Sequence, residues 1–197
     1  MSTSSKRFYI LFALTILITL GSLARSGLLD EPEARLMGSI PPLNGWVRGL
    51  LNVISSLTGS LPLLLMLTLL SIGLLLVGRK AGSLEAAYLA LSLIVTDIIT
   101  VAFKVAVARP RPMSHMNAFS YPSGHVARLS FLSFHAHTYD RRSSALMISL
   151  LALVALSRVA LKVHYPTDVA GGMALGYLVH HLSSRLEERL KLKVFKT

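Results

Sequence analysis

The chain alternates between long apolar runs and short polar segments. Residues 8–24, 49–78 and 143–157 carry no charged side chain, and residues 86–103 carry only Asp97. A helix needs roughly 20 apolar residues to cross the hydrocarbon core of a bilayer. Shorter apolar runs lie on either side of residues 143–157. The pattern therefore predicts six membrane-spanning helices, over residues 8–25, 60–78, 84–107, 122–139, 143–162 and 166–185.

These runs are expected to form one domain. No internal repeat and no low-complexity linker separates them, so we predict an all-α, six-helix transmembrane bundle in a single integral membrane domain over residues 1–197. The first run leaves a second interpretation open, because Lys6 and Arg7 precede it as the basic residues of a signal peptide would. Cleavage there would leave five spans and would move one terminus across the membrane.

The overall composition supports a membrane protein. Hydrophobic residues make up 53% of the chain and charged residues 15%, whereas about 25% of the residues in soluble domains are charged. The chain has no cysteine, which excludes disulfide and thiol chemistry.

The net charge of +11 raises the question of nucleic-acid binding. Its placement argues against that function, because many basic residues gather in three pairs and in the C-terminal tail, which six alternating spans put on one side of the membrane. These residues are Lys6, Arg7, Arg79, Lys80, Arg141, Arg142, Arg185, Arg189, Lys191, Lys193 and Lys196. Cytoplasmic loops are enriched in lysine and arginine, so we expect a multi-pass protein of the cell membrane with both termini in the cytoplasm. The tail is predicted to be a short helix on the anionic inner surface or a solvated extension of the last span.

The six spans leave three outer loops, over residues 26–60, 108–121 and 163–165. The first loop contains a segment whose apolar side chains fall near one face of a helix, namely Trp46, Leu50, Leu51, Ile54 and Leu57. This periodicity favours a short amphipathic helix in the membrane interface, anchored by the indole of Trp46. A plain extension of the second span is the alternative.

The sequence YPSGH, over residues 121–125, opens the fourth span. Pro122 suits the first turn of a helix, where its missing N–H costs nothing. Ser123, Gly124 and His125 would then share that turn, and the free N–H groups at a helix start attract phosphate. The segment therefore favours an anion-binding site that carries a hydroxyl and an imidazole. A proline-started helix with a glycine for packing is the plain structural alternative.

Three further helix ends fall on the same outer face, because consecutive spans run in opposite directions. Lys104 and Arg111 lie at the end of the third span. Arg158 ends the fifth span, and His164 and Asp168 flank the start of the sixth.

The cations on or near this face are Lys104, Arg109, Arg111, Arg128, Arg158 and Lys162, with Asp168 as the obvious carboxylate among them. Clustered cations at a membrane edge are costly unless an anion completes the site, and guanidinium groups suit phosphate oxygens. Snorkelling of these side chains to lipid headgroups is the alternative.

Two histidines and a carboxylate in this cluster fit phosphoryl transfer. One histidine can attack phosphorus while a carboxylate holds its tautomer, and the other can protonate the departing oxygen. Fixed cations would stabilise the oxygens of the transition state. The residues by themselves do not decide whether His125 or His164 is the nucleophile.

Other polar residues lie outside this cluster. Asp97, inside the third span, is expected to pair with a basic group near the site, to influence Lys104, or to bond Ser or Thr on a neighbouring helix. The pairs His135–His137 and His180–His181 have spacings that put their members on different helix faces, so we expect interfacial or hydrogen-bonded histidines and no metal site. His115, in the second outer loop, is a candidate substrate contact.

Three segments together resemble the three motifs of the type 2 phosphatidic acid phosphatase superfamily, which also includes bacterial acid phosphatases and vanadium haloperoxidases. They are Lys104-x6-Arg111-Pro112, Pro122-Ser123-Gly124-His125 and Ser157-Arg158-x5-His164-x3-Asp168. They occur in the family's order and spacing, cover residues 104–168 and show no departure at a signature position. The predicted six-span layout is similar to the lipid-phosphatase branch.

The resemblance implies a role for each signature residue. His164 would be the nucleophile that forms a phosphohistidine, Asp168 would orient and activate it, and His125 would be the general acid for the leaving group. Phosphate would be bound by Lys104, Arg111, Ser123, Gly124 and Arg158. Water would then hydrolyse the phosphoenzyme, and the family needs no metal or other cofactor.

The expected substrate is a lipid phosphate, because a phosphate at the outer, extracytoplasmic surface with its tail in the bilayer can reach the site sideways. Among the substrates that the resemblance implies, we favour a polyprenyl diphosphate over phosphatidic acid and phosphatidylglycerol phosphate. A phosphotransferase with the same site and a non-enzymatic lipid-binding protein or anion carrier are the alternatives. Membrane lipids are the other expected partners, and the sequence predicts no particular oligomeric state.

Overall fold

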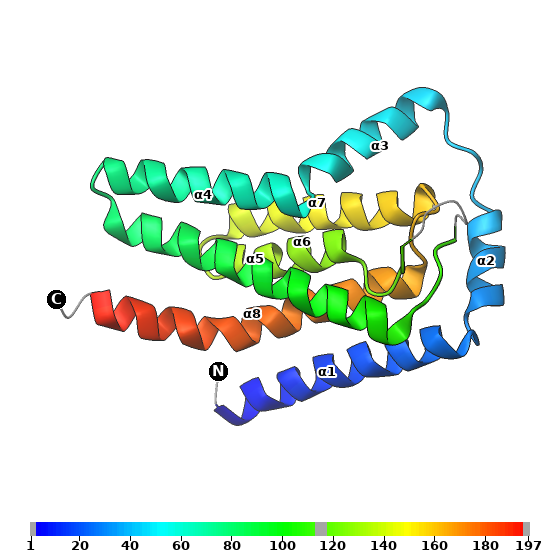
Figure 1. Cartoon of the computed structure of the whole chain (residues 1–197), viewed down its shortest axis with the longest axis horizontal. Helices are drawn as coiled ribbons and strands as arrows, with labels where there is room; N and C mark the ends of the chain where they lie inside the picture. Colours follow the sequence, from blue (N-terminus) through cyan, green and yellow to red (C-terminus); the bar gives the residue numbers. More distant parts are fainter. Residues whose placement is uncertain (1–2, 113–117, 195–197) are drawn as a thin grey trace.

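The computed structural model describes residues 3–112 and 118–194, and the side chains of residues 7–112 and 118–184. All regular structure in that part of the chain is helical (Figure 1). The helices are α1 (Thr3–Ser26), α2 (Asp30–Gly38), α3 (Gly45–Leu57), α4 (Ser60–Leu76), α5 (Lys80–Val107), α6 (Gly124–Ala136), α7 (Arg141–Ala160) and α8 (Pro166–Val194). The predicted substrate contact His115 lies outside the described residues.

A helix occupies each of the six predicted spans. The start of the fourth differs, because α6 begins at Gly124 with Ser123 as its extended N-cap residue. The expectation that Pro122 lies in the first helical turn is therefore wrong. The last helix, α8, continues without a break through Val194, which agrees with an extended last span and not with a separate tail helix.

Within the described residues, three helices are long and apolar enough to cross a membrane by themselves, namely Arg7–Ser26 of α1, α5 and α7. A fourth candidate is the pair of α3 and α4, which is bent by 48° at the break between the two helices. Helix α6 has 13 residues and rises about 20 Å, which is less than the roughly 30 Å of a hydrocarbon core. Passage of all six bundle helices through the membrane therefore stays a prediction.

Helix α6 packs against α5, α7 and α8 and is the central helix of the bundle. Its contact with α8 is close because two glycines of α8 face it. A Cβ atom at Gly172 would lie 2.6 Å from the carbonyl oxygen of Ser123, and one at Gly176 would lie 2.3 Å from the carbonyl oxygen of Ala127. Only glycine permits this approach of the two backbones, which brings the first turns of α6 and α8 together.

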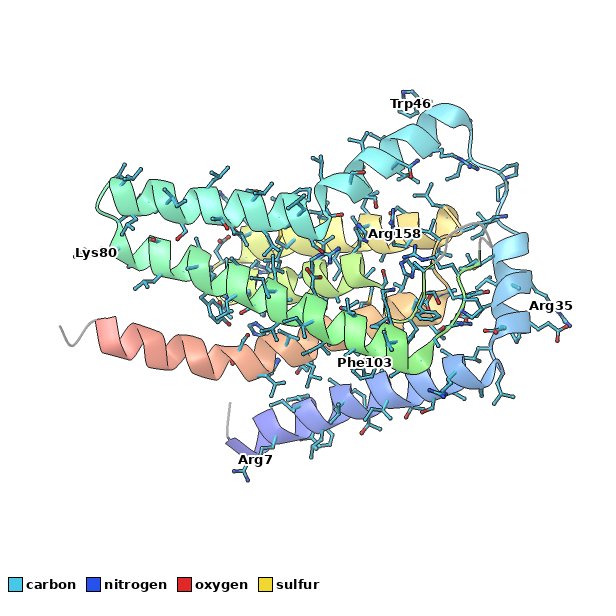
Figure 2. The ribbon with its side chains drawn as sticks, in the orientation of Figure 1. Arg7, Arg35, Trp46, Lys80, Phe103 and Arg158 are labelled. Carbon is cyan, nitrogen blue, oxygen red and sulfur yellow. The ribbon has the colours of Figure 1, made fainter. Side chains whose placement is uncertain are left out.

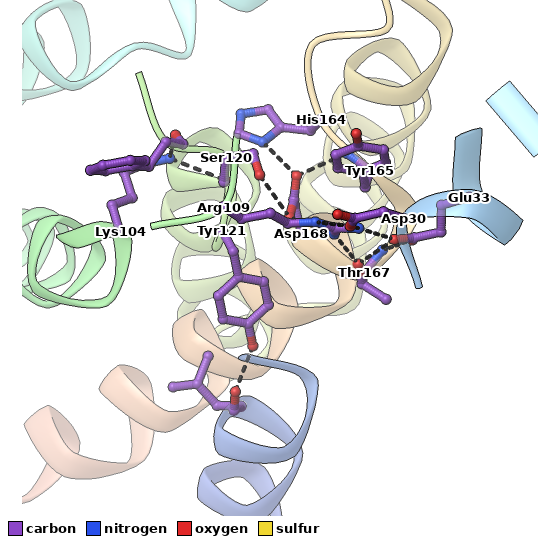
Figure 3. Close-up of polar contacts among 12 residues, drawn as sticks. Asp30, Glu33, Lys104, Arg109, Ser120, Tyr121, His164, Tyr165, Thr167 and Asp168 are labelled. Carbon is purple, nitrogen blue, oxygen red and sulfur yellow. Dashed lines mark hydrogen bonds and ion pairs between the residues drawn. The ribbon is translucent and has the colours of Figure 1, made fainter. Parts of the chain in front are cut away.

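Tyr121 fastens the loop before α6 to α1. Its hydroxyl donates a hydrogen bond to the carbonyl oxygen of Leu17 over 2.6 Å, and its side chain is fully buried (Figure 3). The ring lies against Gly171 of α8, where a Cβ atom would come within 2.5 Å of it, and against Gly21 of α1. The loop therefore enters α6 from a fixed position between α1 and α8.

The first outer loop contains the expected amphipathic helix, α3. Asn44 caps it, and its Oδ1 accepts a hydrogen bond from the N–H of Val47 over 2.9 Å. The helix packs against α7 and exposes one apolar face, whose large side chains are Trp46, Leu50, Val53 and Leu57. Trp46 is 76% exposed and points away from the bundle (Figure 2). An exposed apolar face of this kind is typical of a helix that lies in a membrane interface.

A second helix in the same loop, α2, was not predicted. It begins with Asp30 and carries acidic residues and a proline in its first turn, which favours a helix start. Its sequence has no long apolar run, so the apolar pattern does not predict a helix there. Helix α2 closes the end of the bundle near the starts of α6 and α8 (Figure 1).

Candidate active site

The turn between α7 and α8 holds the predicted nucleophile and its carboxylate. Nδ1 of His164 lies 3.3 Å from Oδ2 of Asp168, and the same oxygen accepts a hydrogen bond from the N–H of Tyr165 over 2.8 Å (Figure 3). Helix α8 begins at Pro166, as predicted, so Asp168 lies in its first turn. His164 is 2% exposed and Asp168 is fully buried. The structure therefore brings the predicted pair into direct contact in a site shielded from water.

Burial lowers the pKa of His164 to about 4, although its hydrogen bond to Asp168 and the negative charge of that carboxylate act in the opposite direction. The imidazole is therefore neutral near pH 7. When its Nδ1–H is directed at Asp168, Nε2 keeps a free lone pair, which is the state that a nucleophilic histidine requires.

The start of α6 lies directly beside this pair. The N–H of Ser123 donates a hydrogen bond to the backbone carbonyl of Asp168 over 2.9 Å. Since that N–H is used, the free backbone donors of the predicted anion site begin at Gly124. The hydroxyl oxygen of Ser123 is buried and has no hydrogen-bond partner among the described residues. His125 follows in the first turn, within electrostatic range of His164 and Arg158.

Three predicted phosphate-binding cations surround this helix start. Lys104, in the last turn of α5, donates hydrogen bonds to the carbonyl oxygens of Phe119 and Ser120 over 2.7 and 3.1 Å. Arg158 is buried, and its Nε has no hydrogen-bond partner within the described part of the chain. Burial also lowers the pKa of Arg111, against the attraction of Asp168. Buried cationic donors near the start of a helix suit an anion with several oxygen acceptors.

All eight predicted site residues gather at one end of the bundle, where α5 and α7 end and α6 and α8 begin (Figure 1). They are Lys104, Arg111, Ser123, Gly124, His125, Arg158, His164 and Asp168. Their catalytic and phosphate-binding roles stay predictions.

Arg109 was expected among the cations that face phosphate or lipid, and that expectation is wrong. It is 1% exposed, and its guanidinium forms ion pairs with Asp30, Glu33 and Asp168. Asp30 and Glu33 were not predicted as residues of the site. One feature of the sequence could have indicated them: the acidic segment over residues 30–33 lies in a predicted outer loop, on the same side as an excess of cations.

Arg128 is a second outer cation with a carboxylate partner. It lies on α6, forms an ion pair with Asp97 of α5, and donates a hydrogen bond to Oγ of Ser60 over 2.7 Å. Of the three possibilities considered for Asp97, the structure shows the pairing with a basic group. The pair joins the centre of the bundle to the bend between α3 and α4, and the guanidinium of Arg128 lies beside the start of α6, since a Cβ atom at Gly124 would lie 3.4 Å from its Nη1.

The histidines at the other end of the bundle pack among aromatic side chains. The rings of His135 and His180 are stacked on or tilted against Phe131 and Phe134, and Nδ1 of His137 lies 3.2 Å from Oγ of Ser144. No group of three or more His, Cys, Asp or Glu side chains in the described residues is arranged to hold a metal ion.

A family model described as the PAP2 superfamily matches residues 85–191, which is more than half of the chain. The chain belongs to the PAP2 superfamily. The match contains α6, α7 and nearly all of α5 and α8, and thus every residue of the candidate site. The resemblance to the type 2 phosphatidic acid phosphatases is therefore confirmed at the level of the family.

Known PAP2 proteins share both sequence and fold with this chain. Phosphatidylglycerophosphatase B of Bacillus subtilis (strain 168) is 35% identical over 96 residues, which cover 41% of this chain and 45% of that protein. The matched segment is thus less than half of the relative's length.

Two solved structures have the same arrangement of helices. A crystal structure described as the first transmembrane PAP2 type phosphatidylglycerolphosphate phosphatase from Bacillus subtilis superposes with a TM-score of 0.77 at 20% identity, over 92% of this chain and 97% of that one. Aquifex aeolicus LpxE superposes with a TM-score of 0.60 at 18% identity, over 77% and 92% of the two chains. Together with the apolar helices, these neighbours show a PAP2 fold in a multi-pass membrane protein.

The PAP2 site has the parts that phosphoryl transfer needs. A neutral imidazole is fixed by a carboxylate. The second imidazole and the cations Lys104, Arg111 and Arg158 lie within electrostatic range of this pair or of each other. Such a site can stabilise a five-coordinate phosphorus through positive charge that belongs to the protein itself.

Proposed function

We propose that this protein is a membrane lipid phosphatase that hydrolyses a lipid phosphate or diphosphate through a phosphohistidine at His164. The observation that carries the proposal is the contact between the His164–Asp168 pair and the start of α6, made by the hydrogen bond from Ser123 N–H to the Asp168 carbonyl. In this proposal the nucleophile lies next to the backbone N–H groups at the start of α6. Membership of the PAP2 superfamily supports the same activity.

In the first step, the phosphate binds to Lys104, Arg111 and Arg158 and to the N–H groups at the start of α6. Nε2 of His164 attacks phosphorus, a P–N bond forms, and the P–O bond to the leaving group breaks. His125 gives its proton to the departing oxygen. Asp168 accepts the hydrogen bond from Nδ1–H of His164 and stabilises the positive charge that develops on the imidazole.

In the second step, water hydrolyses the phosphohistidine. His125, now neutral, removes a proton from the water as its oxygen attacks phosphorus. The P–N bond breaks, His164 regains its lone pair, and inorganic phosphate leaves. The three cations hold the equatorial oxygens in both steps, so the scheme requires no metal ion.

Two substrate classes compete within this proposal. The first candidate is a polyprenyl diphosphate, with its tail in the bilayer and its phosphates at the extracytoplasmic surface. The two Bacillus subtilis relatives are named for phosphatidylglycerophosphate, which supports that lipid as the second candidate. Both have a phosphate next to a membrane-embedded tail, and the same site serves either.

The topology that we propose has six crossings, both termini in the cytoplasm and the site on the outer face. The exposed apolar face of α3 beside the site end of the bundle supports this arrangement, since such a helix fits a bilayer surface.

The test is phosphate release by purified protein from polyprenyl diphosphate, phosphatidylglycerophosphate and phosphatidic acid in mixed micelles. We expect turnover of at least one lipid and complete loss in His164→Ala. Transfer of the phosphate to an added alcohol or lipid, without release of inorganic phosphate, would identify a phosphotransferase. If the wild-type protein binds these lipids but hydrolyses none of them, it is a non-enzymatic carrier and the proposal is rejected.

A further inference from the structure

Arg109 is the most extensively paired side chain near the candidate site. Its Nε and Nη2 donate to Oδ1 of Asp30 over 3.0 and 2.6 Å, and Nη2 also donates to Oε2 of Glu33 over 2.7 Å. On the other side, Nη1 donates to Oγ1 of Thr167 over 2.7 Å and to Oδ1 of Asp168 over 3.3 Å. The guanidinium therefore joins α2 to the first turn of α8 (Figure 3).

Glu33 makes the second connection between the same two helices. Its Oε1 accepts a hydrogen bond from the N–H of Thr167 over 2.7 Å, and its Oε2 accepts one from Oγ1 of Thr167 over 2.9 Å. A carboxylate that accepts a free N–H at a helix start stabilises that helix end. A residue of α2, 134 positions away in the chain, thus caps the helix that carries Asp168.

These contacts determine the orientation of the Asp168 carboxylate. Its Oδ2 faces His164 and the N–H of Tyr165, and its Oδ1 accepts from Arg109 and, over 3.3 Å, from Oγ of Ser120. Arg109 supplies the positive charge on the side that faces away from the imidazole. Loss of that charge would leave a buried carboxylate without its fixed cation, which is costly and frees the carboxylate to rotate.

Contacts with α2 stabilise the positive charge of Arg109. Burial lowers the pKa of this guanidinium, but hydrogen bonds to Glu33 and Asp30 and the charge of Asp168 more than offset that effect, so the pKa is raised. Tyr165 covers the guanidinium, whose carbon lies 3.8 Å from the centre of the ring.

We propose that Arg109 and Glu33 are positioning residues: together they hold Asp168, and through it His164, in the attacking orientation, with α2 as the supporting element. Neither side chain binds the substrate. The inference rests on the proposed phosphatase function, and it assigns to the outer helix α2 a part in the rate of the chemical step.

The test compares kcat and KM for wild type, Arg109→Gln, Arg109→Lys and Glu33→Gln. A positioning role predicts that kcat falls about 100-fold in Arg109→Gln and about tenfold in Glu33→Gln, while KM stays within about threefold. Arg109→Lys keeps the charge but loses the planar fork, and we expect it to recover part of kcat. Glu31→Gln is the matched control, because Glu31 lies on the same helix and its carboxylate is exposed in a pair with Arg35.

The two residues are expected to act as one unit. The double variant Arg109→Gln with Glu33→Gln should have the kcat of Arg109→Gln alone, whereas a product of the two single losses would overturn the proposal. If Arg109→Gln does not fold, Glu33→Gln and Thr167→Val carry the test. Normal kcat in the folded fraction of these variants, even with a lower melting temperature, would show a merely structural role and overturn it.

The outcome also separates this inference from the proposed function. A wild-type protein that hydrolyses none of the lipid phosphates would reject both. Wild-type turnover that Arg109→Gln and Glu33→Gln leave unchanged would reject the positioning role alone.

Discussion

The N–H of Ser123 donates a hydrogen bond to the backbone carbonyl of Asp168 over 2.9 Å. This bond joins the N-cap residue of α6 to the first turn of α8, so the relative position of His125 and His164 depends on main-chain contacts. The glycine-lined crossing of α6 and α8 supports the same arrangement. Side-chain substitutions within the site are therefore expected to alter the chemistry and to leave the scaffold intact.

The role of His125 as general acid can be tested through the leaving group. We expect His125→Ala to reduce turnover of an alkyl lipid phosphate about 100- to 10,000-fold. Turnover of an aryl phosphate with an acidic phenol should fall much less, because that leaving group needs no proton. Equal losses on both substrates, measured as kcat in the same detergent, would contradict the assignment.

The lowered pKa of His164 predicts an unusually acidic limit of activity. Only the neutral imidazole attacks, and its pKa of about 4 keeps it neutral well below pH 6.5. After correction for ionisation of the substrate phosphate, kcat/KM should stay constant from neutral pH to about pH 5. Below about pH 4 it should fall tenfold per pH unit. Asp168 raises this pKa, so Asp168→Asn should move the limit to still lower pH. A limit near pH 6.5 in the wild type would rule out a buried neutral nucleophile.

The crossing of α6 and α8 should not tolerate a larger residue. A Cβ atom at Gly176 would lie 2.3 Å from the Ala127 carbonyl oxygen and 2.5 Å from Cβ of Ser130. We expect Gly176→Ala to lower stability by about 1–3 kcal/mol or more, to lower the melting temperature in detergent and to reduce activity. Gly73→Ala on α4 is the control, because nothing lies within 4 Å of its Cβ position. An unchanged melting temperature in Gly176→Ala would be evidence against this packing.

The amphipathic helix α3 should lie in the bilayer surface. Trp46 is the only tryptophan in the chain, so its fluorescence reports on α3 alone. In vesicles we expect blue-shifted emission and stronger quenching by lipids brominated near the headgroup than by lipids brominated at the tail end. Emission typical of water, with no quenching by either lipid, would mean that α3 does not contact the membrane.

Chelation separates a cation-only site from a metal-dependent one. The proposed phosphate ligands are Lys104, Arg111 and Arg158, which carry their charge without a metal. We therefore expect full turnover after dialysis against EDTA. Loss of activity that Mg²⁺ or Zn²⁺ restores would contradict the proposed mechanism.

Much of the local structure was predictable. Apolar runs predicted a helix at each of the six spans, and the predicted start of the last span at Pro166 is the start of α8. The three motifs predicted which residues meet at one end of the bundle, because alternating spans leave few ways to arrange their ends. The start of α6 was misplaced, since Pro122 is equally compatible with the loop before a helix.

Partners from distant segments were not predictable in the same way. Arg109 was grouped with the phosphate-facing cations, yet it pairs with Asp30, Glu33 and Asp168. Arg128 meets Asp97 across the α5–α6 contact. In the sequence, all cations near one membrane face look alike, because nothing local tells whether a carboxylate from another helix will reach them.

The sequence by itself determined the apolar segments, the class of fold and the set of side chains from which a phosphoryl-transfer site can be built, because hydrophobic length and motif spacing are properties of neighbouring residues. Only the tertiary structure decided which cations pair with a carboxylate from a distant segment, as Arg109 and Arg128 do, and it alone revealed that α2 contacts Arg109 and the first turn of α8. The physical reason is that ion pairs and backbone crossings depend on distances of a few ångströms between helices, and those distances exist only after the helices have packed.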